Sequence, residues 1–186
     1  MISEDMPYTK KFAEVKGKQI AYIDEGKGDP IVLIHGNPTS SFLWRNVIPE
    51  LTDFGRVIAP DLVGHGESCK MPTNQGPKAF SLESAYSYID LLFQKIDADK
   101  NVILVLHDWG SAIGFMWAMR HMNSVKGLAY MEAIVTPLDW NDWPENAVGI
   151  FKGFRSEKGE DLIGNRNLFI EAVLPLSLIH ISEPTR

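Results

Sequence analysis

The sequence predicts an α/β fold built on a mostly parallel, doubly wound sheet with helices on both faces. Short apolar runs at 31–34, 57–59 and 102–106 suit strands that are buried on both faces. Helical patterns separate these runs, and a strand–helix alternation implies parallel strands joined by crossovers. Polar residues follow the strands, and ligands bind at the carboxyl ends of the strands in such sheets.

The composition is that of an ordinary globular protein. The 186 residues suffice for one domain with a sizeable core, and 45% of them are hydrophobic and 23% charged. A net charge of −6 without a basic cluster argues against binding to nucleic acid or to an anionic membrane surface. We identify no signal peptide and no apolar stretch of about 20 residues that would span a membrane. With one cysteine, Cys69, the chain is expected in the cytoplasm, and the periplasm is also compatible.

The first half of the chain reads as four strands and one helix. Residues 11–15 and 19–24 predict a hairpin that turns at Lys16-Gly17-Lys18. The apolar runs 31–34 and 57–59 predict two further strands, with a helix at about 44–51 between them. A glycine-punctuated loop, Asp61 to Ser68, comes next, and a loop rich in Pro, Gly and Asn follows at 71–80.

The second half continues the alternation and then changes character. Ser81 is a favourable cap for a helix whose apolar residues recur at steps of three and four up to Ile96. A strand at 102–106, a helix to about His121 and a strand at 125–131 complete a core unit, for which we expect the bounds 1–136. Aromatic residues and prolines mark the next stretch, 137–175, with short helices near 145–155 and 168–174. We interpret it as the beginning of a helical cap.

The turn after the strand at 102–106 is the most informative feature. The string His107-Asp108-Trp109-Gly110-Ser111 passes from a buried strand into a helix through a tight turn with Asp108 at its apex, as in a nucleophile elbow that carries a carboxylate instead of serine. Gly110 and Gly114 permit close backbone approach. An ionised carboxylate needs no base before it attacks, but it requires an electrophilic carbon with a good leaving group. The alternative, that Asp108 only caps the helix, leaves the rest of the string unexplained.

With these residues in place, the chain resembles the haloalkane dehalogenases of the α/β-hydrolase superfamily, from about Lys11 to about Pro175. The matching strings are Asp24-Glu25-Gly26, His35-Gly36-Asn37-Pro38-Thr39-Ser40-Ser41, Leu43-Trp44-Arg45-Asn46, the elbow and Met131-Glu132-Ala133. The resemblance implies an α/β-hydrolase fold whose last strands are missing from this chain, and a non-native tail at 176–186. It implies hydrolysis of a small apolar halogenated substrate to alcohol and halide, with water as co-substrate, no cofactor and no metal. We expect a monomer without nucleic-acid or membrane partners.

The resemblance also implies residue roles. Asp108 attacks the halogen-bearing carbon and forms an alkyl-enzyme ester. Asn37 and Trp109 hold the departing halide through their side-chain N–H groups, and Glu132 orients a catalytic histidine. The substrate pocket is expected to be lined by Trp143, Phe151, Phe169 and Val173.

None of the five histidines lies where the resemblance implies the general base. His35 is expected to be structural in its turn, His65 and His121 to be loop and helix-end residues, and His107 to be a hydrogen-bonded core residue. His180 falls in the tail. We therefore expect this chain to stop at the covalent ester after one turnover, or to be inactive, and its sheet to end in an uncovered edge.

Three other functions fit part of the pattern. An epoxide hydrolase shares a carboxylate elbow but activates the leaving oxygen with cap tyrosines, so it does not need Asn37. A related monooxygenase luciferase shares the scaffold and would emit light with an imidazopyrazinone. A non-catalytic fragment or binding module would give neither halide release nor a covalent adduct. Asn37 favours dehalogenation among these.

Overall fold

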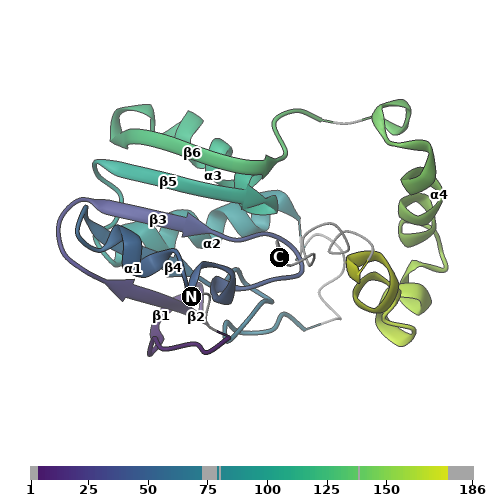
Figure 1. The fold of residues 1–186 in the computed structure, drawn as a ribbon, viewed down its shortest axis with the longest axis horizontal. Coiled ribbons are helices and arrows are strands. Elements are labelled where there is room, and N and C mark those ends of the chain that lie inside the picture. Colours follow the sequence, from purple (N-terminus) through teal and green to yellow (C-terminus); the bar gives the residue numbers. More distant parts are fainter. Residues whose placement is uncertain (1–3, 73–78, 80, 138, 176–186) are drawn as a thin grey trace, which may run out of the picture. The chain divides into compact units, whose positions relative to one another are not determined.

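A mixed sheet organises the first part of the chain in a computed structural model, which describes residues 4–72, 79, 81–137 and 139–175. Among these residues the sheet has six strands in the order β1-β2-β4-β3-β5-β6 (Figure 1). The strands are Lys11–Val15 (β1), Lys18–Glu25 (β2), Pro30–Ile34 (β3), Arg56–Pro60 (β4), Val102–Asp108 (β5) and Val125–Ala133 (β6). β1, β2 and β4 pair antiparallel, whereas β4, β3, β5 and β6 run parallel. The predicted α/β fold with a mostly parallel sheet is confirmed.

Helices cover both faces of this sheet, and each face has its own buried cluster. Helices α2 (Leu82–Lys95) and α3 (Trp109–Arg120) pack on one face, over a cluster that includes Val32, Ile34, Ile58, Leu104 and Leu106. On the other face, Trp44 and Ile48 pack against Ile31, Leu33, Val57 and Ala59. The predicted cap of α2 is confirmed, because the Ser81 hydroxyl accepts the Ser84 N–H at 3.2 Å.

The prediction of a single helix over 44–51 is wrong. A 3₁₀ helix, Ser41–Trp44 (η1), comes first, and a short helix, Ile48–Leu51 (α1), begins only after a turn. Pro49 lies in the first turn of α1, where its missing N–H costs nothing, whereas inside a longer helix it would remove a hydrogen bond. The proline therefore starts a new helix.

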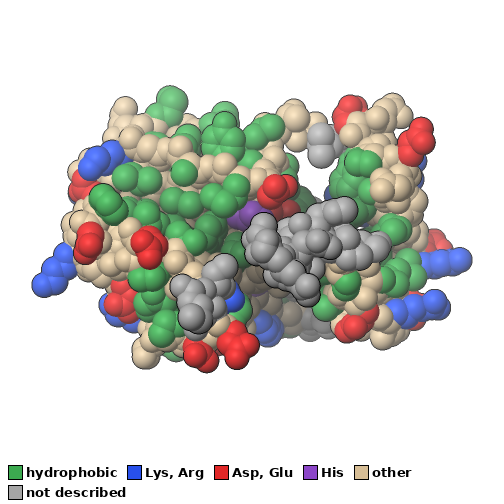
Figure 2. Space-filling view, in the orientation of Figure 1, with side chains coloured by type: hydrophobic (Ala, Val, Ile, Leu, Met, Phe, Trp, Pro, Cys, Tyr) green, Lys and Arg blue, Asp and Glu red, His purple; other side chains and the backbone are tan. Residues whose placement is uncertain are grey.

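Strand β6 lies at one edge of the sheet and exposes large hydrophobic side chains. Leu128, Tyr130 and Met131 are 46%, 57% and 44% exposed. A groove of about 600 Å³ between α3 and β6 is lined by Phe115, Ala118, Met119, Met122, Val125, Leu128, Tyr130 and Val135. Figure 2 shows hydrophobic side chains gathered over β5 and β6 on the viewed face. Within the described residues no strand pairs with the outer edge of β6.

Contacts divide the chain into two units, Met1–Val135 and Thr136–Arg186. The second contains a 3₁₀ turn, Trp140–Asp142 (η5), helix α4 (Glu145–Phe154) and two π-helical turns, Asp161–Asn165 (η6) and Phe169–Val173 (η7). The helix predicted at 145–155 is therefore present, and that predicted at 168–174 is a π-helical turn. The proposed tail at 176–186 and most of the loop predicted at 71–80 lie outside the described residues. None of the described helices has the length and apolarity needed to cross a membrane.

Candidate functional site

Asp108 lies at the sharp turn between β5 and α3. Its backbone has φ 51° and ψ −127°, a region that residues other than glycine rarely adopt. The carboxylate makes no capping hydrogen bond to α3, so the alternative that Asp108 only caps the helix is contradicted. Its Oδ1 instead accepts the backbone N–H of Asn37 at 2.8 Å. The carboxylate therefore faces the loop that follows β3.

Three glycines leave room for this turn. A methyl group on Gly36 would lie 2.3 Å from Asp108 Oδ1, and one on Gly110 would lie 2.3 Å from a β3 carbonyl oxygen. Gly114 makes room for Leu106 in the same way, because a methyl group there would lie 2.3 Å from Leu106 Cδ2. At Gly110 the clash would be with backbone oxygens and at Gly36 with Asp108 itself, so a side chain there would displace the turn. At Gly114 the buried Leu106 side chain would have to shift instead.

Asn37 and Trp109 line one cavity of about 430 Å³ beside this turn. Its other walls are Leu62, Val63, His65, Ala79, Ser81, Leu82, Ala85 and Ile113. Most of these side chains are apolar, whereas the Asn37 amide and the Trp109 indole carry N–H donors. A mostly apolar cavity with a few donors suits a small apolar molecule, one end of which becomes negatively charged.

Glu132 lies inside β6, whereas the sequence placed it just beyond a strand end. His107 of β5 pairs with Met131 and Asp108 pairs with Ala133, so Glu132 is the extra residue of a β-bulge. Its φ is 47°, again in the left-handed region. A bulge changes the direction of the side chain that it carries. Here the bulge lies opposite His107 and Asp108, the last two residues of β5. The structure thus brings Glu132 to the same end of the sheet as the elbow.

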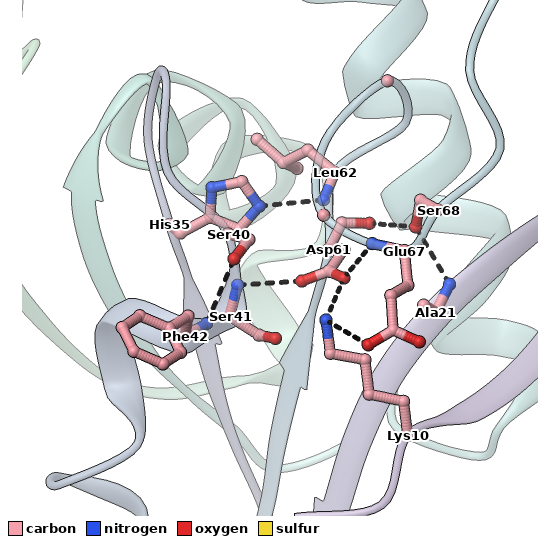
Figure 3. Close-up of polar contacts among 12 residues, drawn as sticks. Lys10, Ala21, His35, Ser40, Ser41, Phe42, Asp61, Leu62, Glu67 and Ser68 are labelled. Atoms are coloured by element: carbon pink, nitrogen blue, oxygen red, sulfur yellow. Dashed lines mark hydrogen bonds and ion pairs between the residues drawn. The ribbon is translucent and has the colours of Figure 1, made fainter. Parts of the chain in front are cut away.

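A buried polar network joins the loops that follow β3 and β4 (Figure 3). Asp61 is fully buried; it accepts the backbone N–H groups of Ser41 and Glu67, both at 2.8 Å, and pairs with the Lys10 ammonium. Burial raises the pKa of Asp61, but the hydrogen bonds from Lys10 and the two N–H groups outweigh it, and the pKa lies below its usual value. The ionised carboxylate ties down the loop that carries Asn37.

His35 belongs to the same two loops. Its Nε2 accepts the Leu62 N–H at 2.9 Å, so Nδ1 carries the proton and donates to the Gly36 carbonyl at 2.8 Å. The ring is fully buried, and burial lowers the pKa of His35 to about 4. Both nitrogens are therefore committed to the backbone, in agreement with the predicted structural role.

Two other histidines, His121 and His107, have different surroundings. His121 follows α3, lies 2.8 Å from the Asp90 carboxylate and stacks on Trp117, as a helix-end residue. His107 was expected to be hydrogen-bonded in the core, and the structure differs. Its buried Nδ1 has no hydrogen-bond partner among the described residues, and its ring meets Trp44 edge-on at 6.5 Å.

The four residues predicted to line the substrate pocket belong to the second unit. Within that unit Phe151 lies 4.5 Å from Trp143 and 6.5 Å from Phe169, measured between ring centroids, and Val173 lies in the turn η7. The sequence reasoning missed the walls supplied by the first unit, above all His65. The sequence did contain a signal for His65: the loop that begins at Asp61 follows strand β4, just as the loop with Asn37 follows strand β3.

A search against protein families matches the alpha/beta hydrolase fold to residues 29–169. Two curated relatives are haloalkane dehalogenases: that of Sphingobium indicum is 51% identical over 89% of this chain, and that of Mycolicibacterium smegmatis is 45% identical over 91%. The coelenterazine h 2-monooxygenase of Renilla reniformis is 33% identical over 89%. The matches cover 56%, 54% and 52% of these proteins, so the chain spans about half their length.

Solved structures agree with these relatives. The haloalkane dehalogenase DatA of Agrobacterium tumefaciens superposes with a TM-score of 0.82 at 34% identity, over 90% of this chain and 56% of that one. DbeA of Bradyrhizobium elkani gives 0.82 at 35%, over 90% and 57%. The resemblance found in the sequence is confirmed. Among the described residues, no group of three or more His, Cys, Asp or Glu side chains is placed to hold a metal ion.

Proposed function

Because the chain belongs to the alpha/beta hydrolase fold family, we propose that it carries the first half of a haloalkane dehalogenase reaction, in which Asp108 displaces halide from a haloalkane. The observation that carries the proposal is the position of Asn37. Its backbone N–H donates to the Asp108 carboxylate, and its side chain lines an apolar cavity together with Trp109.

The hydrogen bond from Asn37 distinguishes the two carboxylate oxygens of Asp108. Oδ1 accepts the N–H, which leaves Oδ2 as the stronger nucleophile. In the proposed step an Oδ2 electron pair forms a bond to the halogen-bearing carbon, and the carbon–halogen bond breaks with its pair leaving on the halide. The products are halide and an alkyl ester whose carbonyl oxygen is Oδ1.

Two side-chain donors are proposed to stabilise the departing halide. The Asn37 amide supplies two N–H groups and the Trp109 indole supplies one, and both side chains line the cavity of about 430 Å³. Donors held where negative charge develops contribute roughly 3 kcal/mol each to the transition state. The apolar walls bind the alkyl part of a small substrate, and we propose Trp143, Phe151, Phe169 and Val173 as further substrate contacts.

Hydrolysis of the ester requires a base to activate water, and the proposed reaction needs no other co-reactant. The Asn37 N–H is suited to hold Oδ1 as it becomes an oxyanion. We propose Glu132 as the partner of a base histidine. Among the described residues, His35 binds two backbone groups, His121 pairs with Asp90, and His65 contacts Asn37. The fourth histidine, His107, meets Trp44 edge-on, and its Nδ1 has no hydrogen-bond partner among the described residues. We propose that in this chain the ester persists, and that the chain acts as a monomer.

Intact-mass measurement after incubation with 1-bromobutane tests this proposal. We expect one butyl adduct, which fragmentation assigns to Asp108, and one bromide released per chain. Asp108→Asn removes the nucleophile and is expected to give no adduct. Sustained bromide release would contradict the persistent ester, and a folded protein with neither adduct nor bromide would favour a non-catalytic role. Diol formation from an epoxide, or light from an imidazopyrazinone, would favour the other two functions.

A further inference from the structure

His65 contacts the proposed halide-binding residue Asn37 and lines the same cavity. The ring is half-buried in the loop after β4. Its Nε2 lies 3.3 Å from Asn37 Oδ1 and its Nδ1 lies 3.3 Å from the Val63 carbonyl oxygen. The His35 ring meets it edge-on, with 5.4 Å between centroids. His65 thus bridges the buried network and the cavity.

The two ends of the Asn37 amide have nearly the same shape and opposite hydrogen-bonding character. Its nitrogen donates to an anion, whereas its oxygen repels one. Rotation of the amide by half a turn exchanges the two ends, so a neighbour must select the orientation. His65 is the neighbour whose ring contacts the oxygen end.

A neutral imidazole carries only one N–H, and its position decides the orientation of the amide. With the proton on Nε2, His65 donates to Asn37 Oδ1, and the amide nitrogen is directed to the cavity. With the proton on Nδ1, His65 donates to the Val63 carbonyl, and its Nε2 lone pair faces Oδ1. Two acceptors repel at this distance, so the amide turns over and its oxygen replaces its nitrogen at the cavity. A doubly protonated ring donates to both oxygens.

We propose that His65 is a positioning residue, which donates from Nε2 to Asn37 Oδ1 and so directs the amide N–H groups of Asn37 toward the halide. The inference rests on the proposed function, since it assigns the geometry of the halide site. It adds to that function a residue from a second loop, 28 positions along the chain.

Several charged groups act on the ring. Burial lowers the pKa of His65, and Lys70 lowers it further, whereas the contact with the Val63 carbonyl and the Asp61 carboxylate raise it; the net direction is downward. The neighbouring ring of His35 is neutral near pH 7 because its own pKa is about 4. The Asp108 carboxylate accepts the backbone N–H of Asn37. In α2, the element across the cavity, Glu83 is engaged by Arg120.

These surroundings predict the sign of a pH effect. The pKa of His65 lies below the ordinary value for histidine, so the ring is neutral at pH 7 and gains a second proton only in more acidic solution. The protonated ring must donate from Nε2, so it holds the amide in the halide-binding orientation at all times. Halide affinity is therefore expected to increase as the pH falls through the pKa of His65, and by linkage halide raises that pKa.

Iodide titration followed by quenching of tryptophan fluorescence tests the inference, with Trp109→Phe as the blank for quenching at other tryptophans. His65→Leu removes the donor and is expected to weaken iodide binding about tenfold, the effect of one hydrogen bond. His65→Gln restores an N–H donor and is expected to stay within about threefold of the unmodified protein. The increase in affinity at low pH should be absent from both variants.

A double-mutant cycle separates positioning from a general structural effect. In an Asn37→Ala background, His65→Leu is expected to change iodide binding no further, because there is no amide left to orient. A full loss in that background, or an unchanged affinity in His65→Leu, would overturn the inference. So would a nitrogen-15 spectrum of the unmodified protein that places the neutral ring's proton on Nδ1.

Failure of this inference about His65 can be distinguished from failure of the proposed function. Absence of the butyl adduct contradicts the chemistry assigned to Asp108, and the iodide titration still decides the role of His65. Absence of iodide binding in the unmodified protein overturns the inference even where the adduct forms.

Discussion

Lowering the pH from 7 to 4.5 is expected to destabilise the fold through one buried ring, His35. In the folded chain both ring nitrogens are committed to backbone groups, and burial lowers the pKa to about 4. In the unfolded chain the ring titrates near 6.5. Below pH 6.5 the unfolded chain therefore binds a proton that the folded chain does not, and stability falls until the pH passes the folded pKa near 4.

The size of the effect follows from the two pKa values of His35. Each unit of difference corresponds to 1.36 kcal/mol, so a change from 6.5 to about 4 amounts to about 3 kcal/mol between pH 7 and pH 4. Most of this loss has occurred by pH 4.5. With a urea dependence of about 2 kcal/mol per molar, the unfolding midpoint is expected to shift downward by about 1.5 M urea.

Urea unfolding at pH 7, 6, 5 and 4.5, followed by circular dichroism, measures this shift. His35→Gln keeps an acceptor near the Leu62 N–H and cannot titrate. It is expected to be less stable at pH 7 and to lose most of the pH dependence. His65→Gln serves as the matched control, because it removes the neighbouring imidazole and leaves His35 in place. A pH slope that persists in His35→Gln and disappears in His65→Gln would refute the reasoning.

Two further substitutions test the packing around the elbow. Gly36→Ala is expected to abolish the butyl adduct, because the added methyl group would lie 2.3 Å from the reacting carboxylate. Gly149→Ala is the control, since an added methyl group there has no atom within 4 Å. Equal adduct yields from the two variants would contradict the expectation. Asp61→Asn leaves the Lys10 ammonium, whose side chain is 8% exposed, without its charge partner and is expected to cost about 3–5 kcal/mol in urea unfolding. Asp29→Asn breaks an exposed ion pair with Lys126 and is expected to change stability far less, because solvent screens the pair. A similar loss in both variants would show that burial is not the cause.

The strands and the amphipathic helix could be predicted because each depends on a local pattern. All five residues of β3 are buried, as an apolar run in a parallel sheet requires, and α2 buries the stripe that begins after Ser81. The elbow could also be predicted from its string of residues, since a tight strand-to-helix turn needs Gly110 beside Asp108. These features need no knowledge of distant contacts.

The features that could not be predicted from the sequence depend on contacts between distant segments. The bulge at Glu132 exists only in the register between β5 and β6, and the extended run of β6 contains no local sign of it. The contact of His65 with Asn37 joins two loops, and its ring therefore read as an ordinary loop residue. The unpaired Nδ1 of His107 likewise depends on what surrounds β5. A sequence read locally does not contain these neighbours.

Ser111 connects the two strained residues of the site. Asp108 and Glu132 both have positive φ, which costs energy for residues other than glycine and persists only when surrounding bonds enforce it. The Ser111 hydroxyl donates to the Asp108 carbonyl and accepts the N–H of Ile134, two residues beyond Glu132. Ser111 is fully buried, so this bridge is protected from water. One hydroxyl in the first turn of α3 therefore holds the end of β5 to the end of β6, and the strain at the nucleophile and at the bulge is maintained by the same bond pair.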